Sequence, residues 1–155
     1  MKRIHLILAG VLTLATSAAT VASAQQRVAP AHVSRAAMVS QRQTGLGKIL
    51  VSASGRTLYE FTRDRTNRDT CAAVSGCPEV WPPLQSSGRP LAGSGVRSSL
   101  LSTITLRGGI KQVTYAGHPL YLYSGDSGPG ETSYVGERAF GGNWYAINSS
   151  GHTVK

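Results

Sequence analysis

The feature that most constrains this chain is an internal repeat whose two copies are related by one constant offset. Positions 55–64 align without a gap with positions 117–126, and Gly, Leu, Tyr, a second aromatic residue and Asp recur at the same places. A Trp follows the Asp of each copy at nearly the same spacing. The motif residues are Tyr59, Phe61, Asp64 and Trp81 in the first copy and Tyr121, Tyr123, Asp126 and Trp144 in the second. Self-similarity of this kind predicts two copies of one structural unit.

Short apolar runs separated by Gly, Ser and Asn follow residue 47 and predict strands. We expect strands at 48–53, 57–62, 99–106, 110–115, 119–124 and 143–147, with a hairpin turn at 107–109. No segment after residue 45 has the period of a helix. The fold class predicted is therefore all-β: a small single domain of two tandem β-repeats, arranged as a sandwich or as a twin-repeat antiparallel sheet.

The expected domain covers residues 47–151, with repeat one at about 48–84 and repeat two at about 110–147. Residues 25–46 are rich in Ala, Gln, Ser and Arg and lack aromatic residues, which indicates a disordered tether. Within it, residues 33–41 have the composition for a turn or two of helix.

The N-terminus has the three parts of a secretory signal peptide. Lys2 and Arg3 precede an apolar run from Leu6 to about Ala15, and Ala22-Ser23-Ala24 forms an A-x-A cleavage site. The apolar run is shorter than the roughly 20 residues that a transmembrane helix needs. We expect cleavage after Ala24 and a secreted or periplasmic product without a transmembrane segment. Because no Cys lies near the cleavage site, we do not expect a lipid anchor.

Cys71 and Cys77 are the only cysteines of the chain. A pair in an exported protein is typical of a disulfide bond. Zinc is the competing interpretation, but two thiolates do not complete a site and no His lies at ligand spacing beside them. Motifs for covalent haem attachment and for redox exchange are absent as well. We expect a structural disulfide, no bound metal and no cofactor.

The charge of the chain indicates what kind of partner it attracts. Without Lys2 and Arg3, 14 Lys and Arg face 7 Asp and Glu, so the mature protein carries a charge of about +7. The expected compartment and the absence of a basic stripe interleaved with aromatic residues argue against nucleic acid. Attraction to anionic envelope components fits better, although the charge can also serve solubility alone. Arg63, Arg65 and Arg68, mixed with Asp64 and Asp69, predict a charged loop. Such a loop is usually a solvated face, and the alternative is a contact for an anionic partner.

These motifs together resemble a known family. The chain is similar to bacterial secreted proteins and lipoproteins that carry a Tyr-x-aromatic-x-x-Asp motif, the secreted repeat of unknown function. The shared residues include Thr57-Leu58-Tyr59, the Cys71/Cys77 pair, Trp81-Pro82-Pro83-Leu84, Pro119-Leu120-Tyr121, Asp126-x-x-Pro129-Gly130 and Gly141-Gly142-x-Trp144. Many members begin with a lipidated Cys, which is missing here, so their anchoring does not transfer. The resemblance implies a secreted β-repeat protein and no particular activity.

Asp64 and Asp126 are the weak catalytic candidates, since both follow a predicted strand. A carboxylate at that place can accept backbone N–H groups and fix a turn, which is the role we expect. The alternative pairs the two as an acid and a base, because paired carboxylates do such work when their pKa values differ. Neither loop offers the oxygen ligands that calcium needs.

Three function hypotheses follow. The first is an exported, non-enzymatic β-repeat module that binds a component of the envelope or of the medium. The second is a hydrolase or lyase that uses Asp64 and Asp126 beside Tyr59 and Tyr121, and it requires an open cleft between the two carboxylates. The third is a binder of haem, copper or another small ligand, and it requires His118 or His152 to meet a Tyr in a pocket. Both histidines are otherwise expected at the surface.

Overall fold

The computed structural model describes residues 36–155 of the chain. The predicted signal peptide at 1–24 and residues 25–35 of the predicted tether lie outside the described residues. Within 36–155 the chain forms mostly short strands, as the all-β prediction states, with one helical turn, α1 (Cys77–Val80). Three 3-10 turns complete the elements, at Cys71–Ala73, Ser98–Leu100 and Arg107–Gly109.

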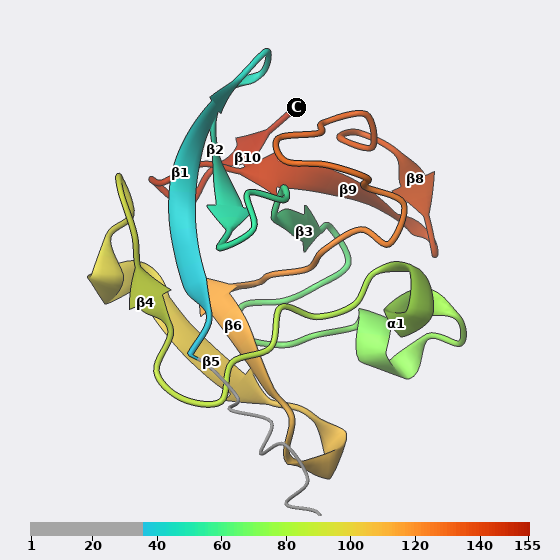
Figure 1. The fold of residues 1–155 in the computed structure, drawn as a ribbon. Coiled ribbons are helices and arrows are strands. Elements are labelled where there is room, and N and C mark those ends of the chain that lie inside the picture. Colours follow the sequence, from blue (N-terminus) through green and yellow to red (C-terminus); the bar gives the residue numbers. More distant parts are fainter. Residues whose placement is uncertain (1–35) are drawn as a thin grey trace, which may run out of the picture. The chain divides into compact units, whose positions relative to one another are not determined.

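Two antiparallel hairpins form the main strand pairs of the fold (Figure 1). The first joins β1 (Met38–Thr44) to β2 (Gly47–Ser52), and β4 (Leu91–Ala92) adds to β1 in parallel. The second joins β5 (Leu101–Thr105) to β6 (Lys111–Tyr115), and β7 (His118–Pro119) follows β6. The offset that relates Tyr59 to Tyr121 also places the first hairpin on the second, so the repeat extends to the strands before the sequence motif.

The prediction of a disordered tether up to residue 46 is wrong for β1, and so is the suggested helix where it overlaps this strand. β1 has a polar sequence, and Val39 is its one fully buried residue. Its ladder with β2 runs from Val39 opposite Ser52 to Thr44 opposite Gly47. Backbone pairing across a tight turn holds the strand in place, and its side chains carry almost no apolar alternation. The ordered domain therefore begins before residue 47.

The last segment of each repeat pairs with the other repeat. β9 (Gly142–Ile147) belongs to repeat two and pairs with β3 (Tyr59–Phe61) of repeat one, while β8 (Arg138–Ala139) and β10 (Thr153–Val154) flank β9. In the opposite sense, Leu84 of repeat one donates its N–H to the carbonyl of Leu120 and accepts the N–H of Val113, each at 2.8 Å. Figure 1 shows β9 running alongside β3. The two repeats thus exchange their final segments.

A pseudo-two-fold axis runs between Tyr59 and Tyr121. Each of these residues donates its backbone N–H to the carbonyl of the other at 2.9 Å. The glycines that open the motif, Gly55 and Gly117, both have positive φ values, +81° and +84°. A Cβ at Gly55 would lie 2.9 Å from Pro129 Cβ, and one at Gly117 would lie 2.7 Å from the Thr66 methyl group. Glycine is therefore required at the same place in both copies.

The repeat strands are covered on both faces because their side chains alternate. Leu58 and Leu120 enter an aliphatic core with residues of the two hairpins. Tyr59 and Tyr121 point the other way, into an aromatic cluster that contains both Trp residues and both Cys residues. All four of these Leu and Tyr residues are completely buried. In repeat two, however, the strand predicted at 119–124 is limited to β7 and an isolated bridge at Tyr121.

Candidate functional site

The aromatic cluster repeats the same contacts on either side of the pseudo-two-fold. Trp81 and Trp144 stack on each other at its centre, with ring centroids 3.9 Å apart. Tyr59 meets Trp81 edge-on at 5.1 Å, and Tyr121 meets Trp144 edge-on at the same distance. The second aromatic residue of each motif packs on the Trp of the opposite repeat: Phe61 lies 4.1 Å from Trp144 and Tyr123 lies 4.5 Å from Trp81. The six aromatic motif residues therefore form one scaffold.

The two motif Asp residues also make contacts between the two repeats. The Tyr121 hydroxyl donates to Asp64 at 2.7 Å, and the Tyr59 hydroxyl reaches both carboxylate oxygens of Asp126 at 3.3 Å. Each Asp thus holds the motif Tyr of the other repeat. Asp64 also accepts the backbone N–H of Thr70 at 2.7 Å, which agrees with the predicted role as a loop clamp. The sequence predicts that Asp126 accepts a hydrogen bond from a nearby backbone N–H. In the structure the donor to Asp126 is instead the Tyr59 hydroxyl.

Burial dominates the electrostatics of the Tyr–Asp pairs. It raises the pKa of Asp64 from 3.8 to about 6, against the hydrogen bonds from Tyr121 and Thr70, which lower it. Burial likewise raises the pKa of Asp126 to about 6, while the bond from Tyr59 lowers it. Burial, and then the charge of the partner Asp, raises the pKa of both Tyr hydroxyls, so they remain neutral donors. The environments of the two carboxyl groups do not separate their pKa values in the way an acid–base pair requires.

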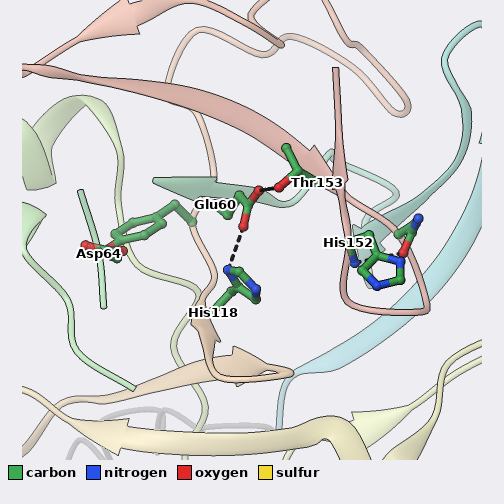
Figure 2. Close-up of polar contacts among 7 residues, drawn as sticks. Glu60, Asp64, His118, His152 and Thr153 are labelled. Atoms are coloured by element: carbon green, nitrogen blue, oxygen red, sulfur yellow. Dashed lines mark hydrogen bonds and ion pairs between the residues drawn. The ribbon is translucent and has the colours of Figure 1, made fainter. Parts of the chain in front are cut away.

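A second polar cluster, which the sequence analysis missed, centres on Glu60. This residue is buried, at 5% exposed, and one of its carboxylate oxygens lies 2.6 Å from Nδ1 of His118. Thr153 of β10 donates its hydroxyl to the other oxygen. Figure 2 shows Glu60 between His118 and Thr153, with Asp64 and His152 to either side. The hydrogen bond that the His118 ring donates to Glu60 raises the pKa of His118, although partial burial of the ring opposes the shift.

This arrangement corrects the expectation for His118, which is half-buried and paired, whereas His152 is exposed as expected. Within the described residues 36–155, no group of three or more His, Cys, Asp or Glu side chains could hold a metal ion. Glu60 was missed because it lies inside the repeat motif at a position that is Leu122 in the second copy. This difference, a carboxylate in one copy and an apolar side chain in the other, is the sequence signal that could have revealed Glu60.

The loop after β3 forms a basic cavity, here called the arginine cavity. It has a volume of about 340 Å³ and is lined by Arg63, Arg65, Arg68, Asp69, Thr70 and Ala73. Asp64 and Asp126 are not among the lining residues. The three arginines that the sequence analysis singled out therefore line one cavity, and Asp69 is the one carboxylate among its lining residues.

Several contacts hold this loop in place. Arg65 and Arg68 exchange backbone hydrogen bonds of 3.3 and 2.9 Å, and Asn67 donates its N–H to the carbonyl of Gly117 at 2.7 Å. The guanidinium group of Arg63 donates to the carbonyl of Phe140 at 2.7 Å. The loop is therefore fixed to repeat two while its arginine side chains stay exposed.

Cys71 and Cys77 are joined by a disulfide with an S–S distance of 2.00 Å, as predicted. Both are buried in the aromatic cluster. The bond closes the loop 71–77, which contains Ala73 of the arginine cavity and ends at the first residue of α1.

Comparison with known proteins identifies the repeat. A family model described as a secreted repeat of unknown function matches residues 40–85 and again residues 102–148. Both matches begin before the predicted repeat starts, at 48 and 110, and they include residues of both hairpins. Comparisons with the curated proteins and with the solved structures gave no significant match. No helix within residues 36–155 is long and apolar enough to cross a membrane.

Proposed function

Because the chain belongs to the family of secreted repeats of unknown function, we propose that it is an exported, non-enzymatic module that binds anionic envelope components through the arginine cavity. In this proposal the signal peptide is removed after Ala24 and the mature protein carries no lipid anchor. The family assignment supports the secreted class, and the N-terminal sequence supports cleavage after Ala24. The arginine cavity supports the binding of anions.

The observation that carries the proposal is the concentration of three arginines around one cavity. Guanidinium groups bind phosphate and carboxylate through two parallel hydrogen bonds, which makes arginine suited to anion recognition. The backbone of the loop is fixed by the contacts described above, so binding an anion has to order the arginine side chains but not the loop itself. The excess of Lys and Arg over Asp and Glu, 14 against 7 once Lys2 and Arg3 are removed with the signal peptide, adds long-range attraction.

The geometry of the motif Asp residues favours this proposal over the hydrolase or lyase hypothesis. Each Asp bonds to a buried Tyr hydroxyl and holds the two repeats together. The binding hypothesis based on haem or copper has less support, since the imidazole of His118 is paired with Glu60.

Binding to phosphate-bearing polymers tests the proposal. The mature protein is titrated with poly(glycerol phosphate) chains and, separately, with vesicles that contain phosphatidylglycerol, at low and physiological salt. A double variant, Arg65→Gln with Arg68→Gln, removes two charges from the cavity. The matched control, Arg89→Gln with Arg138→Gln, removes the same charge from exposed arginines outside it.

We expect the cavity variant to bind about tenfold more weakly or worse, since charge-assisted hydrogen bonds contribute about 1.5–3 kcal/mol each and about 1.4 kcal/mol is a factor of ten. The control should lose far less. Equal losses in the two variants would show that net charge alone is responsible, and absence of binding by the unmodified protein to both materials would refute the proposal.

A further inference from the structure

The second hairpin has an open edge along β5. This strand is the end strand of the sheet β5-β6-β7, and within residues 36–155 it pairs only with β6. Beyond the two ends of β5, the N–H of Leu106 bonds to the carbonyl of Ile110, and the N–H of Ala116 bonds to the carbonyl of Leu100. Bonded pairs alternate along an antiparallel ladder, so the even-numbered residues of β5 bond to β6. The odd-numbered residues direct their backbone groups outward.

The outward groups are the N–H of Thr103 and Thr105 and the carbonyls of Leu101 and Thr103, and no described residue bonds to them. The N–H of Leu101 is the exception, since it bonds to the carbonyl of Ser98. Proteins usually protect an edge strand with charges, proline or a bulge. The sequence of β5 has no charge and no Pro, and three of its five residues are β-branched. The strand is therefore an accessible template for another strand.

The matching strand of repeat one shows how such an edge is covered. The constant offset places Gln41 of β1 on Thr103 of β5. The N–H of Gln41 bonds to the carbonyl of Ser94 at 2.9 Å, and Gly93 donates its N–H to the carbonyl of Val39 at 2.7 Å. β4 and the residues after it thus lie along β1, with β4 parallel to it. Repeat one uses the same edge that is open in repeat two.

Repeat two does not cover β5 with its own chain. The constant offset places β4 on β10, which pairs with β9 instead. The Thr153 hydroxyl of β10 also bonds to the buried carboxylate of Glu60. Figure 1 shows β10 beside β9 and away from β5. The segment that matches β4 is therefore held elsewhere, so a strand that covers β5 has to come from outside residues 36–155.

The charges around β5 have one sign. Arg97 and Arg107 lie before and after the strand, Lys111 begins β6, and all three side chains are exposed. No Asp or Glu occurs between Glu79 and Asp126. Antiparallel pairing with β5 of a second copy would bring Arg97 of one copy towards Arg107 of the other, and like charges oppose this. An incoming strand with acidic residues at its ends is attracted instead.

We propose that β5 binds an extended peptide segment of a partner protein, added as a parallel strand, in which acidic residues flank a short uncharged stretch. The outward N–H and C=O groups supply the main-chain bonds of strand addition, and the basic residues attract the ends of the segment. This inference is independent of the arginine cavity, because Arg97, Arg107 and Lys111 are not among the residues that line it. Failure of one proposal leaves the other standing.

Amide hydrogen exchange measured by NMR tests the inference. The probe is a synthetic peptide of alternating Val and Thr with two Glu at each end, and matched peptides carry Gln in place of Glu or Pro at the centre. In the free mature protein, the amide of Thr103 should exchange much faster than that of Gln41, which is bonded. With about nine-tenths of the protein bound, the Glu peptide should slow exchange at Thr103 and Thr105 about tenfold, because exchange then proceeds from the free remainder. The matched peptides should have far less effect.

Two substitutions at one position separate the backbone from the side chain. Thr103→Pro removes an outward N–H, and proline is tolerated where the N–H of an edge strand faces solvent. Thr103→Val keeps the N–H and is the matched control. We expect the Pro variant, once melting curves show that it is folded, to lose binding of the Glu peptide and the Val variant to retain it. The double variant Arg97→Gln with Arg107→Gln should bind the peptide several-fold more weakly and the phosphate polymers as before.

Four results would overturn the proposal. Unchanged exchange at Thr103 with saturating Glu peptide would exclude strand addition, and equal binding of the Pro-containing peptide would show attraction by charge alone. Slow exchange at Thr103 in the free protein, with nuclear Overhauser contacts between β5 and residues 25–35, would show that the chain's own N-terminal segment covers the edge. Self-association in ultracentrifugation that Thr103→Pro abolishes would assign the edge to a second copy.

Discussion

Substituting the two motif Asp residues by Ala should destabilise the protein to different degrees, although the sequence motif treats them as equivalent. Asp64 accepts two short bonds, from the Tyr121 hydroxyl and the Thr70 N–H, both at 2.7 Å. Asp126 holds the Tyr59 hydroxyl at 3.3 Å, beyond the usual O–H···O range. Asp126→Ala is therefore a matched control for Asp64→Ala within the same chain.

The magnitude follows from the number of donors left without a partner. Each unsatisfied buried donor costs about 1–3 kcal/mol, so Asp64→Ala, which affects two, should lower the free energy of unfolding by roughly 2–6 kcal/mol. Asp126→Ala affects one weakly bonded donor and should cost about 1 kcal/mol. In a domain of this size, about 4 °C in melting temperature corresponds to about 1 kcal/mol. We therefore expect losses of roughly 8–24 °C for Asp64→Ala and about 4 °C for Asp126→Ala.

Thermal unfolding at pH 5 is the appropriate assay. Both carboxyl groups have a pKa of about 6, so at pH 5 they are mostly protonated and the cost of burying their charge is small. Asp64→Asn keeps an acceptor oxygen and should fall between the unmodified protein and Asp64→Ala. The reasoning would be refuted if Asp126→Ala lost as much as Asp64→Ala. Raised melting temperatures in both Ala variants would instead support the catalytic hypothesis, because active-site residues often reduce stability.

The remaining predictions concern pH and the disulfide. Because burial raises the folded-state pKa of Asp64 and Asp126 to about 6, the stability they contribute is present below about pH 4 and is lost as the pH rises through 6. A double Asp→Asn variant should lose this pH dependence in melting curves, and an unchanged pH profile would contradict it. The hydrogen bond to Glu60 raises the pKa of His118, so the stability that this pair contributes is fully present below about pH 6.5 and is lost as the pH rises further. The variant His118→Asn should remove only the change in melting temperature above about pH 6.5. Replacing Cys71 and Cys77 by Ala should lower the free energy of unfolding by about 2 kcal/mol, since the closed loop is short; intact-mass analysis showing two free thiols in the unmodified protein would contradict the disulfide.

The strand of the first motif copy, β3, could be predicted because its signal is local, whereas the strand predicted at 119–124 is wrong beyond β7 and an isolated bridge at Tyr121. Leu58 and Tyr59 alternate between two buried faces, and Leu120 and Tyr121 do the same. The constant offset between the copies also predicted matching environments for Tyr59 and Tyr121, and both are completely buried. The turn at 107–109 likewise lies between two strands that pair.

Other features depend on partners far away in the sequence and give no local signal. β1 is polar and is held by its ladder with β2, so its residues resemble a linker. The exchange of final segments places Leu84 against Val113 and Leu120, a pairing that no period within either segment indicates. The bonds that Tyr121 donates to Asp64 and His118 donates to Glu60 cross between repeats in the same way.

The duplicated framework and the candidate sites occupy different residues, and this separation indicates where function lies. The aromatic scaffold and the Tyr–Asp bonds are shared by both copies, and they hold the repeats together. In the alignment of the two copies, the positions that match Arg63, Arg65 and Arg68 are Gly125, Ser127 and Gly130, so the arginine cavity belongs to repeat one alone. Glu60, which pairs with His118, likewise matches Leu122. Residues retained in both copies serve the fold, because both halves need them for the same contacts. Binding chemistry is therefore to be sought where the two copies differ.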